Sequence, residues 1–198
     1  QRELNPSLHE FTDIIISEAD RLRDLVDRLI GPQRQTQKQI CNIHQILDKI
    51  DQLLRAEANG QVQLIRDYDP SLPELLIDAN QMTQVFLNVG RNALQALVEH
   101  QTPNGHICLK TRIVRHCTIG NICHRLACCI SITDNGPGIS ANHIEDIFFP
   151  LVTHRAQGSG LGLSIAQSLI QQHQGLIECD SQSLSLIHIS EPTRLRRI

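Results

Sequence analysis

Two asparagines inside an otherwise apolar helix are the feature that most constrains what this chain can fold into. Residues 79–99 predict a helix, and Asn88 and Asn92 lie four residues apart, so their amides share one face of it. Asparagine weakens a helix interior, which makes a pair at this spacing costly unless the amides have a role. An amide oxygen suits Mg²⁺, which takes few protein ligands and keeps water and phosphate oxygens. The plainer alternative is that each Asn is a solvated or capping residue.

A second stretch, TDNGPGIS at 133–140, predicts a turn that a ligand can approach closely. Asp134 ends a predicted strand, and its carboxylate can accept a hydrogen bond from an exocyclic amine such as that of adenine. Gly136 and Gly138 have no Cβ, so the main chain there can lie against a ring. Because Asp, Asn, Gly and Pro are also the common turn formers, an ordinary turn explains this stretch equally well on its own.

A third stretch, GSGLGLS at 158–164, opens a predicted helix. Main-chain N–H groups at a helix N-terminus bind anions, and glycine allows the loop to wrap a phosphate. The loop before it contains an arginine, which either reaches a phosphate or is an incidental residue of a surface segment. The three stretches together predict a nucleotide site with ATP between a helix and two loops. Its candidate residues on the loop side are Thr153, Arg155, Gly158, Gly160, Leu161 and Gly162.

The order of elements predicts a two-layer α/β sandwich with helices on one face of a mixed sheet. Residues 6–30 predict a long amphipathic helix whose apolar stripe needs a partner, since nothing in its own sequence covers it. The predicted units are this helical segment at 1–32, a polar linker at 33–39, an α/β domain at 40–182 and a tail at 183–198. Within the domain we expect helices near 40–54, 79–99, 141–148 and 161–174, and strands at 62–68, 75–78, 106–114, 125–133 and 175–180.

The tail at 183–198 does not continue this pattern. Such a layout should close with an apolar strand, but SLSLIHISEPTRLRRI has broken alternation, a proline and a basic end. The segment resembles a translated cloning or adaptor scar, with a divergent natural terminus as the alternative. We therefore expect a non-native tail and no closing strand.

Composition excludes several classes of function. A formal net charge of −3 leaves no basic footprint for nucleic acid. The sequence has neither an apolar run of about 18 residues nor a signal-peptide pattern, so we expect a cytoplasmic protein without a membrane partner. The seven cysteines are then expected to be reduced thiols. A zinc site and a plain Cys-containing hairpin tip both remain open for the cluster of His116, Cys117, Cys123 and His124.

The stretches in this order resemble the boxes of one enzyme family. The Asn-bearing helix, the Asp-x-Gly-x-Gly turn, FFP at 148–150 and the Gly-rich loop are similar to the N, G1, F and G2 boxes of the sensor histidine kinase ATP-binding domain. The resemblance implies the Bergerat (GHKL) fold, ATP and Mg²⁺ as cofactors, and a lid over ATP between the F box and the Gly-rich loop. It also implies that Asn92 binds Mg²⁺, that Asn88 supports phosphate or metal, and that Asp134 reads adenine. Residues 20–33 and 64–75 are similar to the sensor kinases that regulate nitrogen assimilation.

One position favours a histidine kinase over other members of the superfamily. Its ATP-hydrolysing enzymes and serine kinases typically carry Glu four residues before the metal-binding Asn, as a base for water or a hydroxyl. That position is Asn88 here, which cannot act as a base. A neutral imidazole already has a lone pair, so phosphorylating a histidine needs no such Glu. An ATP-hydrolysing module and a degenerate, non-catalytic interaction domain remain as alternatives.

The phosphoacceptor histidine of the family has no counterpart in this sequence. Its H-E-[IL]-[KR]-N-P-L box is absent, and His9-Glu10 matches only the first two residues. We therefore expect the chain to bind Mg-ATP without phosphorylating itself. For the intact protein, the resemblance implies a homodimer, phosphotransfer to an NtrC-like response regulator, phosphatase behaviour toward that regulator, and control by a PII signal protein.

Overall fold

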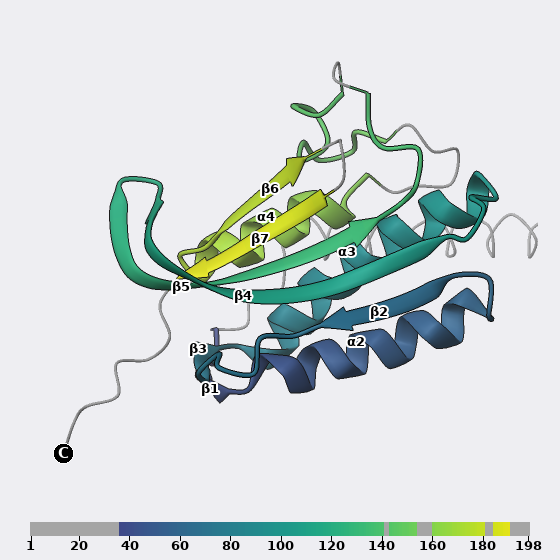
Figure 1. Ribbon diagram of the computed structural model, residues 1–198. Helices are drawn as coiled ribbons and strands as arrows, with labels where there is room; N and C mark the ends of the chain where they lie inside the picture. Colours follow the sequence, from purple (N-terminus) through teal and green to yellow (C-terminus); the bar gives the residue numbers. More distant parts are fainter. Residues whose placement is uncertain (1–35, 141–142, 154–159, 181–183, 191–198) are drawn as a thin grey trace, which may run out of the picture. The chain divides into compact units, whose positions relative to one another are not determined.

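The computed structural model describes residues 36–140, 143–153, 160–180 and 184–190 of the chain. Residues from Thr36 onward form one compact unit (Figure 1). The predicted helix at 6–30 lies outside the described residues, as do Arg155 and Gly158. None of the helices in the described ranges is long and apolar enough to cross a membrane.

A five-stranded mixed sheet forms one layer of this unit. The strands lie in the order β2-β4-β5-β7-β6, with β2 parallel to β4 and the other neighbours antiparallel. A separate two-stranded ribbon joins β1 and β3. The strands are β1 (Gln39–Cys41), β2 (Gln63–Asp67), β3 (Leu75–Ile77), β4 (His106–Ile119), β5 (Ile122–Asp134), β6 (Leu176–Asp180) and β7 (Leu184–Ser190).

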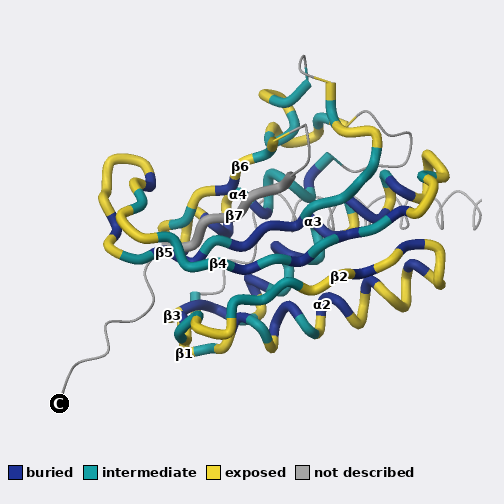
Figure 2. Tube along the Cα trace, in the orientation of Figure 1, coloured by how far each residue is buried: buried dark blue, intermediate teal, exposed yellow. Residues whose placement is uncertain are grey.

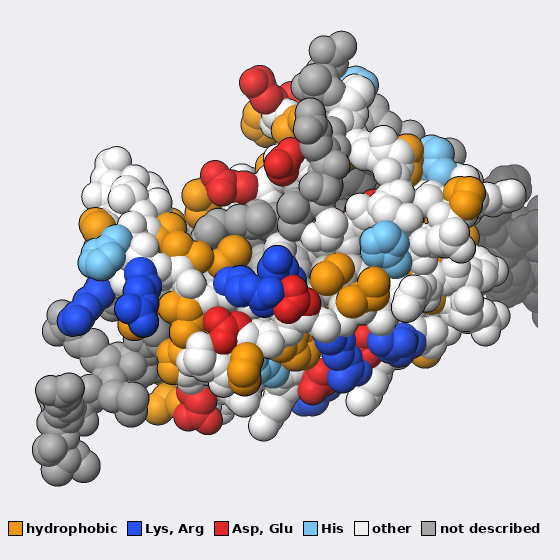
Figure 3. Space-filling model, viewed as in Figure 1, with side chains coloured by type: hydrophobic (Ala, Val, Ile, Leu, Met, Phe, Trp, Pro, Cys, Tyr) orange, Lys and Arg blue, Asp and Glu red, His pale blue; other side chains and the backbone are white. Residues whose placement is uncertain are grey.

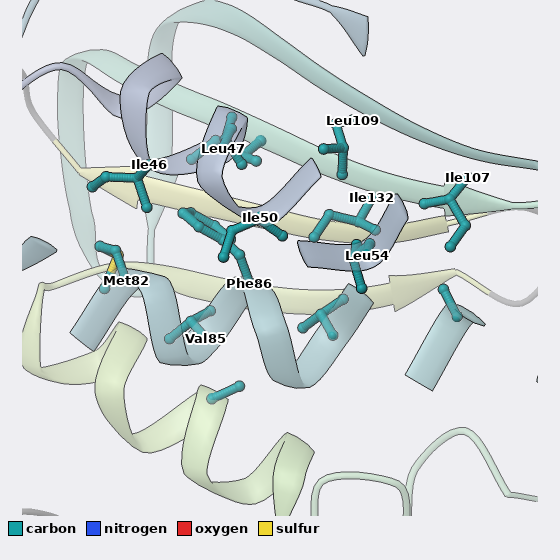
Figure 4. Close-up of a cluster of buried hydrophobic side chains, with 14 of the residues drawn as sticks. Ile46, Leu47, Ile50, Leu54, Met82, Val85, Phe86, Ile107, Leu109 and Ile132 are labelled. Carbon is teal, nitrogen blue, oxygen red and sulfur yellow. The ribbon is translucent and has the colours of Figure 1, made fainter. Parts of the chain in front are cut away.

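Three helices cover one face of the sheet: α2 (Ile43–Ala58), α3 (Ala79–Glu99) and α4 (Gly162–Gln172). The buried positions of α2 and α3 recur every three or four residues and face the strands, as the dark segments of Figure 2 show. Side chains of α2, α3, β4 and β5 converge around Phe86 (Figure 4). Full burial of such a side chain contributes about 1.5–3 kcal/mol, so this cluster holds the two layers together. The predicted two-layer α/β sandwich is confirmed.

Two of the predicted helices differ from the structure. Ile40 belongs to β1 and is exposed, because Asn42 caps α2 by accepting a hydrogen bond from the N–H of His44 at 2.9 Å. The helix expected at 141–148 is wrong over its described part, where successive turns replace it. These turns are closed by i→i+3 bonds such as that from the N–H of Asp146 to the oxygen of His143 at 3.1 Å. No i→i+4 ladder forms there.

The expectation that the closing strand is missing is also wrong. Residues 184–190 form β7, which lies between β5 and β6 and pairs with both in antiparallel register. Main-chain hydrogen bonds, which any sequence except proline can make, complete the sheet and satisfy two strand edges. The weak side-chain alternation of this segment therefore did not reveal the strand. The non-native origin of residues 183–198 stays a prediction.

The Cys- and His-containing segment is the end of a long hairpin formed by β4 and β5. Cys117 pairs with His124 across the hairpin, and Cys123 pairs with Thr118 one step further. Neighbouring residues of a strand point to opposite sides, and accordingly His124 is buried while Cys123 is exposed. In the described parts of the chain, no three His, Cys, Asp or Glu side chains are grouped to hold a metal ion. The arrangement therefore gives no support to a zinc site.

The face of the sheet away from the helices carries paired charges. Arg112 of β4 donates hydrogen bonds of 2.8 and 2.6 Å to the carboxylate of Asp67 in β2, and these lower the pKa of that carboxyl. Figure 3 shows Lys or Arg side chains beside Asp or Glu over the middle of this face. Such exposed pairs contribute little to stability because water and salt screen them.

Asp51 of α2 is a buried carboxylate with two arginine partners. Its Oδ2 accepts hydrogen bonds from Nε of Arg55 at 2.8 Å and from the guanidinium of Arg66 in β2. Burial raises the pKa of Asp51, but the hydrogen bonds from Arg66 and Arg55 outweigh it, and the pKa lies below its ordinary value. Asp48 pairs with the same Arg66 at 2.9 Å but is half-exposed. The buried carboxylate thus fastens α2 to the edge strand.

We expect Asp51→Ala to lower the free energy of unfolding by about 1–3 kcal/mol, because a charge-assisted buried hydrogen-bond network is lost. The matched control Asp48→Ala should cost less than about 1 kcal/mol, as is usual for exposed pairs. Since the folded pKa of Asp51 is depressed, its contribution is present above the unfolded value and is lost as pH falls through the folded value. Urea unfolding at pH 7 and at acidic pH measures both effects. Equal losses in the two variants would contradict this account.

Candidate nucleotide-binding site

Helix α3 carries both asparagines on the side turned away from the hydrophobic core. Asn88 and Asn92 are half-buried, whereas the fully buried residues of α3 lie on its opposite side. The helix begins at Asp78, whose Oδ1 accepts hydrogen bonds from the N–H groups of Asn80 and Gln81 at 3.0 and 3.2 Å. An N-cap of this kind and the packed face behind it hold the amides in position.

Asn88 connects α3 to the Gly-rich loop. Its Nδ2 donates a hydrogen bond to the main-chain oxygen of Gly162, the first residue of α4, at 3.0 Å. A Cβ on Gly162 would lie 3.8 Å from Cβ and Cγ of Asn88, so the loop and the helix touch. The N-cap of α4 is Leu161, a buried residue whose side chain has no oxygen to cap the first turn. The first-turn N–H groups therefore retain the anion affinity of an open helix N-terminus.

The ends of the loop between the F box and α4 are held together at Leu151 and Gly160. The N–H of Leu151 donates to the oxygen of Gly160 at 3.0 Å. Gly160 has a φ of +65°, and a Cβ there would lie 2.7 Å from the carbonyl carbon of Leu151 and 2.9 Å from the nitrogen of Val152. Both contacts are with main chain, which cannot move aside as a flexible side chain would. Glycine is therefore required where the loop closes.

The turn after β5 is organised around Asp134. Its Oδ1 accepts a hydrogen bond from the N–H of Gly136 at 2.8 Å, and a Cβ on Gly136 would lie 2.7 Å from that oxygen. No described residue donates a hydrogen bond to its Oδ2. Gly138 follows with a φ of +73°, a conformation that glycine adopts readily. The turn thus presents one carboxylate oxygen next to exposed main chain.

Helix α3 brings the two Gly-containing segments together. The Cβ position of Gly162 touches Asn88, and that of Gly136 lies 3.6 Å from Cδ2 of Leu97 and 3.8 Å from Cβ of Ala96. These contacts are separated by about nine residues of helix, or roughly 13 Å. Asn92 lies between them on α3. A carboxylate acceptor at one end, an anion-binding helix terminus at the other and amides between them match a ligand with an amine-bearing ring and an anionic tail.

The other residues predicted for the site belong to the loop between the F box and α4. Thr153 is exposed in the part of the loop that the structure describes, and Phe149 and Leu151 are exposed beside it. Phe148 packs against the hydrophobic core, so the F box anchors this loop. Arg155 and Gly158, beyond the described residues, are not placed.

Sequence reasoning missed two residues that shape the site. Asn135 fastens the Asp134 turn: its Oδ1 accepts from the N–H of His106 at 2.7 Å, and its Nδ2 donates to the oxygen of Asn104 at 3.2 Å. His173, just beyond α4, is buried and its Nε2 lies 3.0 Å from the main-chain nitrogen of Asp78. An Asn inside a turn carries no signal of such a role. A histidine that follows an apolar helix stripe is a weak signal that could have marked a buried position.

We expect Gly160→Ala to open the base of the loop. The added methyl group meets the main chain of Leu151 and Val152, so the Leu151 N–H should lose protection from hydrogen exchange by roughly 3- to 10-fold, the equivalent of one hydrogen bond. The matched control is Gly120→Ala at the hairpin tip, where φ is +59° and nothing lies within 4 Å of a Cβ. Gly120→Ala has the same left-handed strain without the collision. Unchanged Leu151 protection in Gly160→Ala would show that the close approach is not a constraint.

Curated relatives match most of this chain. The Sensory histidine kinase/phosphatase NtrB of Vibrio alginolyticus is 50% identical over 177 residues, which cover 89% of this chain and 50% of that protein. The NtrB of Escherichia coli O157:H7 is 49% identical over the same shares. The chain therefore spans about half the length of the curated relatives it matches.

Solved structures share the fold. The nucleotide-free catalytic domain of histidine kinase ThkA superposes with a TM-score of 0.63 at 23% identity, covering 77% of this chain and 95% of that one. ThkA in complex with the response regulator protein TrrA gives a TM-score of 0.66 at 20% identity, covering 98% of this chain and 55% of that one. The fold is therefore the GHKL (Bergerat) fold of histidine kinase catalytic domains.

A family model covers the elements that build the site. The model of the histidine kinase-, DNA gyrase B- and HSP90-like ATPases matches residues 77–194, from the end of β3 past β7. That stretch includes α3, the Asp134 turn, the Gly-rich loop and α4, and membership implies the use of ATP. The chain belongs to the histidine kinase-, DNA gyrase B- and HSP90-like ATPase family.

Proposed function

We propose that this chain is the ATP-binding catalytic part of a two-component sensor histidine kinase that regulates nitrogen assimilation. The observation that carries the proposal is the hydrogen bond from Asn88 to Gly162, which joins the Asn-bearing helix to the phosphate side of the site. The similarity to NtrB kinases over 89% of the chain supports the same assignment. The intact protein would transfer the γ-phosphoryl group of ATP to a histidine and then to a response regulator.

The side chains fit Mg-ATP in their chemistry. Asn92 offers a neutral amide oxygen of the kind that Mg²⁺ accepts, one helical turn from the Gly-rich loop contact. Asp134 would accept a hydrogen bond from the adenine amine through Oδ2, while its Oδ1 holds Gly136. The open N-terminus of α4 would bind phosphate oxygens, with Thr153, Arg155 and Gly158 closing over them. Bound Mg²⁺ would neutralise charge on the phosphates, and the protein would supply positioning.

Asn88 favours phosphoryl transfer to histidine over hydrolysis. An amide cannot take a proton from water or from a hydroxyl group, and the Asn88 amide already donates to Gly162. The attacking nitrogen of a neutral imidazole needs no base. Asn88 therefore positions the loop, and the histidine nucleophile supplies its own lone pair.

The partners that we propose follow from the relatives. A response regulator of the NtrC type would receive the phosphoryl group, and the relatives' name of kinase/phosphatase supports removal of it as well. The complex of ThkA with the response regulator TrrA supports this class of partner. Control by a PII signal protein, dimerisation through the region that includes residues 1–32, and a cytoplasmic location rest on the likeness to NtrB.

We expect Asn92→Ala to abolish Mg-dependent nucleotide binding. An ATP analogue at 100 times its Kd should stabilise the unaltered chain by about 2.7 kcal/mol and raise the thermal midpoint by roughly 5–10 °C. This rise should vanish in Asn92→Ala and with EDTA. Asn80→Ala, an exposed Asn at the other end of α3, is the matched control and should retain it. No midpoint rise in the unaltered chain would point to a degenerate, non-catalytic domain.

We expect γ-labelled ATP to leave no label on this chain alone and to label an added phosphoacceptor hairpin from the Vibrio alginolyticus relative. The label should be acid-labile and base-stable, as phosphohistidine is, and Asn92→Ala should prevent it. Acid-labile label on the chain itself would overturn the prediction that it does not phosphorylate itself. Steady phosphate release that survives Asn88→Ala would instead favour the ATP-hydrolysing alternative.

A further inference from the structure

The segment that leads into the folded unit is hydrogen-bonded to both helices of the nucleotide site. The N–H of Gln37 donates to Oδ2 of Asp78 at 2.9 Å, and Nζ of Lys38 donates to the main-chain oxygen of Gln172 at 3.1 Å. The hydroxyl of Thr36 lies 3.3 Å from Oε1 of Gln172. Asp78 begins α3 and Gln172 ends α4, so residues 36–38 contact the ends of the two helices that lie away from the Gly-rich loop.

His173 joins the same two helix ends. Its Nδ1 lies 2.8 Å from the oxygen of Leu169, and its Nε2 lies 3.0 Å from the main-chain nitrogen of Asp78. Because a carbonyl only accepts and an N–H only donates, these partners select the neutral imidazole with its proton on Nδ1. A proton added to Nε2 would face the N–H of Asp78 and break that bond.

The surroundings of His173 shift its pKa in both directions. Burial lowers the pKa of His173, the oxygen of Leu169 and the carboxylate of Asp78 raise it, and the ammonium of Lys38 lowers it. The net shift is downward. The bond to Asp78 is therefore complete above the ordinary histidine pKa of about 6.5 and is lost as pH falls through the lower folded value.

Helix α4 is tied to α3 at both of its own ends, whereas α3 is tied at its start and near its middle. Asp78 and His173 meet at one end, and Asn88 and Gly162 meet at the other, so α3 and α4 run antiparallel. Ten residues of α3 and eleven of α4 separate the ties, about 15 Å of helix. Helices of this length move as stiff bodies. A shift of α4 against α3 at the His173 end therefore strains the Asn88–Gly162 bond at the nucleotide end.

We propose that the junction of Asp78, Gln172 and His173 couples residues 36–38 to the nucleotide site, with Asp78 and His173 as positioning residues for Asn88 and the Gly-rich loop. The main chain runs directly from Gln35 into Thr36, so a pull on the preceding residues enters the junction through the Gln37–Asp78 bond. The inference rests on the proposed function only for the identity of the ligand. The contacts that carry the coupling do not depend on it. The junction thus allows the residues before Thr36 to lower or raise the affinity for nucleotide without contacting the nucleotide.

The test removes one main-chain donor in the 198-residue chain. Gln37→Pro deletes the N–H that Asp78 accepts, and Gln37→Ala keeps it as the matched control. We expect Gln37→Pro to weaken binding of an ATP analogue about 3- to 10-fold, the range for one net hydrogen bond, with no change in Gln37→Ala. Lys38→Met removes the contact to Gln172 together with the charge that lowers the pKa of His173, and it should give a smaller loss of binding in a chain that remains folded.

Hydrogen exchange measured without nucleotide distinguishes coupling between the two ends of α4 from a loss of protection confined to the junction. In Gln37→Pro and Lys38→Met, protection should fall in the first turn of α4 as well as at the junction, whereas Gln37→Ala should match the unaltered chain. Loss confined to residues near Asp78 and His173, or equal binding in all variants, would overturn the coupling. An unaltered chain that binds no analogue would instead defeat the proposed function, and the exchange result would still decide the coupling.

A pH profile tests the role of His173 itself. Protection of the first turn of α4, corrected for intrinsic exchange, should be constant above about pH 6.5 and fall as pH is lowered below it in the unaltered chain, by about threefold or more for one lost hydrogen bond. His173→Gln places an amide oxygen near the position of Nε2, so it should keep the bond to Asp78 and show a flatter profile. A His173→Gln profile as steep as that of the unaltered chain would exclude His173 as the titrating group.

Discussion

The burial of one face of α3 is the constraint on which the rest of the structure depends. Phe86 and its apolar neighbours on α3 fill the space between α2 and the sheet. Because a helix has 3.6 residues per turn, burying that face fixes Asn88 and Asn92 on the other side. The N-cap at Asp78 then sets where the helix starts, and packing sets its rotation. The site is therefore built on the side of α3 that faces away from the hydrophobic core.

The two glycine-containing segments take their positions from this helix. Gly162 lies against Asn88 and Gly136 lies against Leu97, so one rigid element spaces the anion-binding end from the carboxylate end. At Gly160 and Gly136, a side chain would collide with main chain or with the Asp134 carboxylate. These glycines are needed because parts of the chain approach one another closely, and flexibility alone does not explain them. A site so constrained positions a ligand with little reorganisation.

Local patterns predicted the helices and strands that pack in the core. The apolar stripe of residues 79–99 gave the bounds of α3, and the runs at 106–114 and 125–133 marked β4 and β5, although the hairpin extends further at its tip. Two of the failures were local, at the Asn42 cap of α2 and in the turns at 143–148, and another fell where non-local contacts decide. Residues 184–190 form a strand because β5 and β6 offer main-chain partners on both sides, which no pattern within the segment reveals. For the Cys and His cluster the sequence left a zinc site and a plain hairpin tip both open, and strand pairing places Cys123 and His124 on opposite sides.

The sequence by itself determined the chemistry of the candidate site: two amides one helical turn apart, an acceptor carboxylate before glycines, and a Gly-rich start to a helix. Spacing along a helix and the conformational freedom of glycine are local properties, so they can be read from the order of residues. Only the tertiary structure decided that Asn88 bonds to Gly162, that Asn135 holds the Asp134 turn, and that His173 joins α4 to the start of α3. Each of these bonds links residues at least 29 positions apart, and their proximity follows from how the helices pack on the sheet.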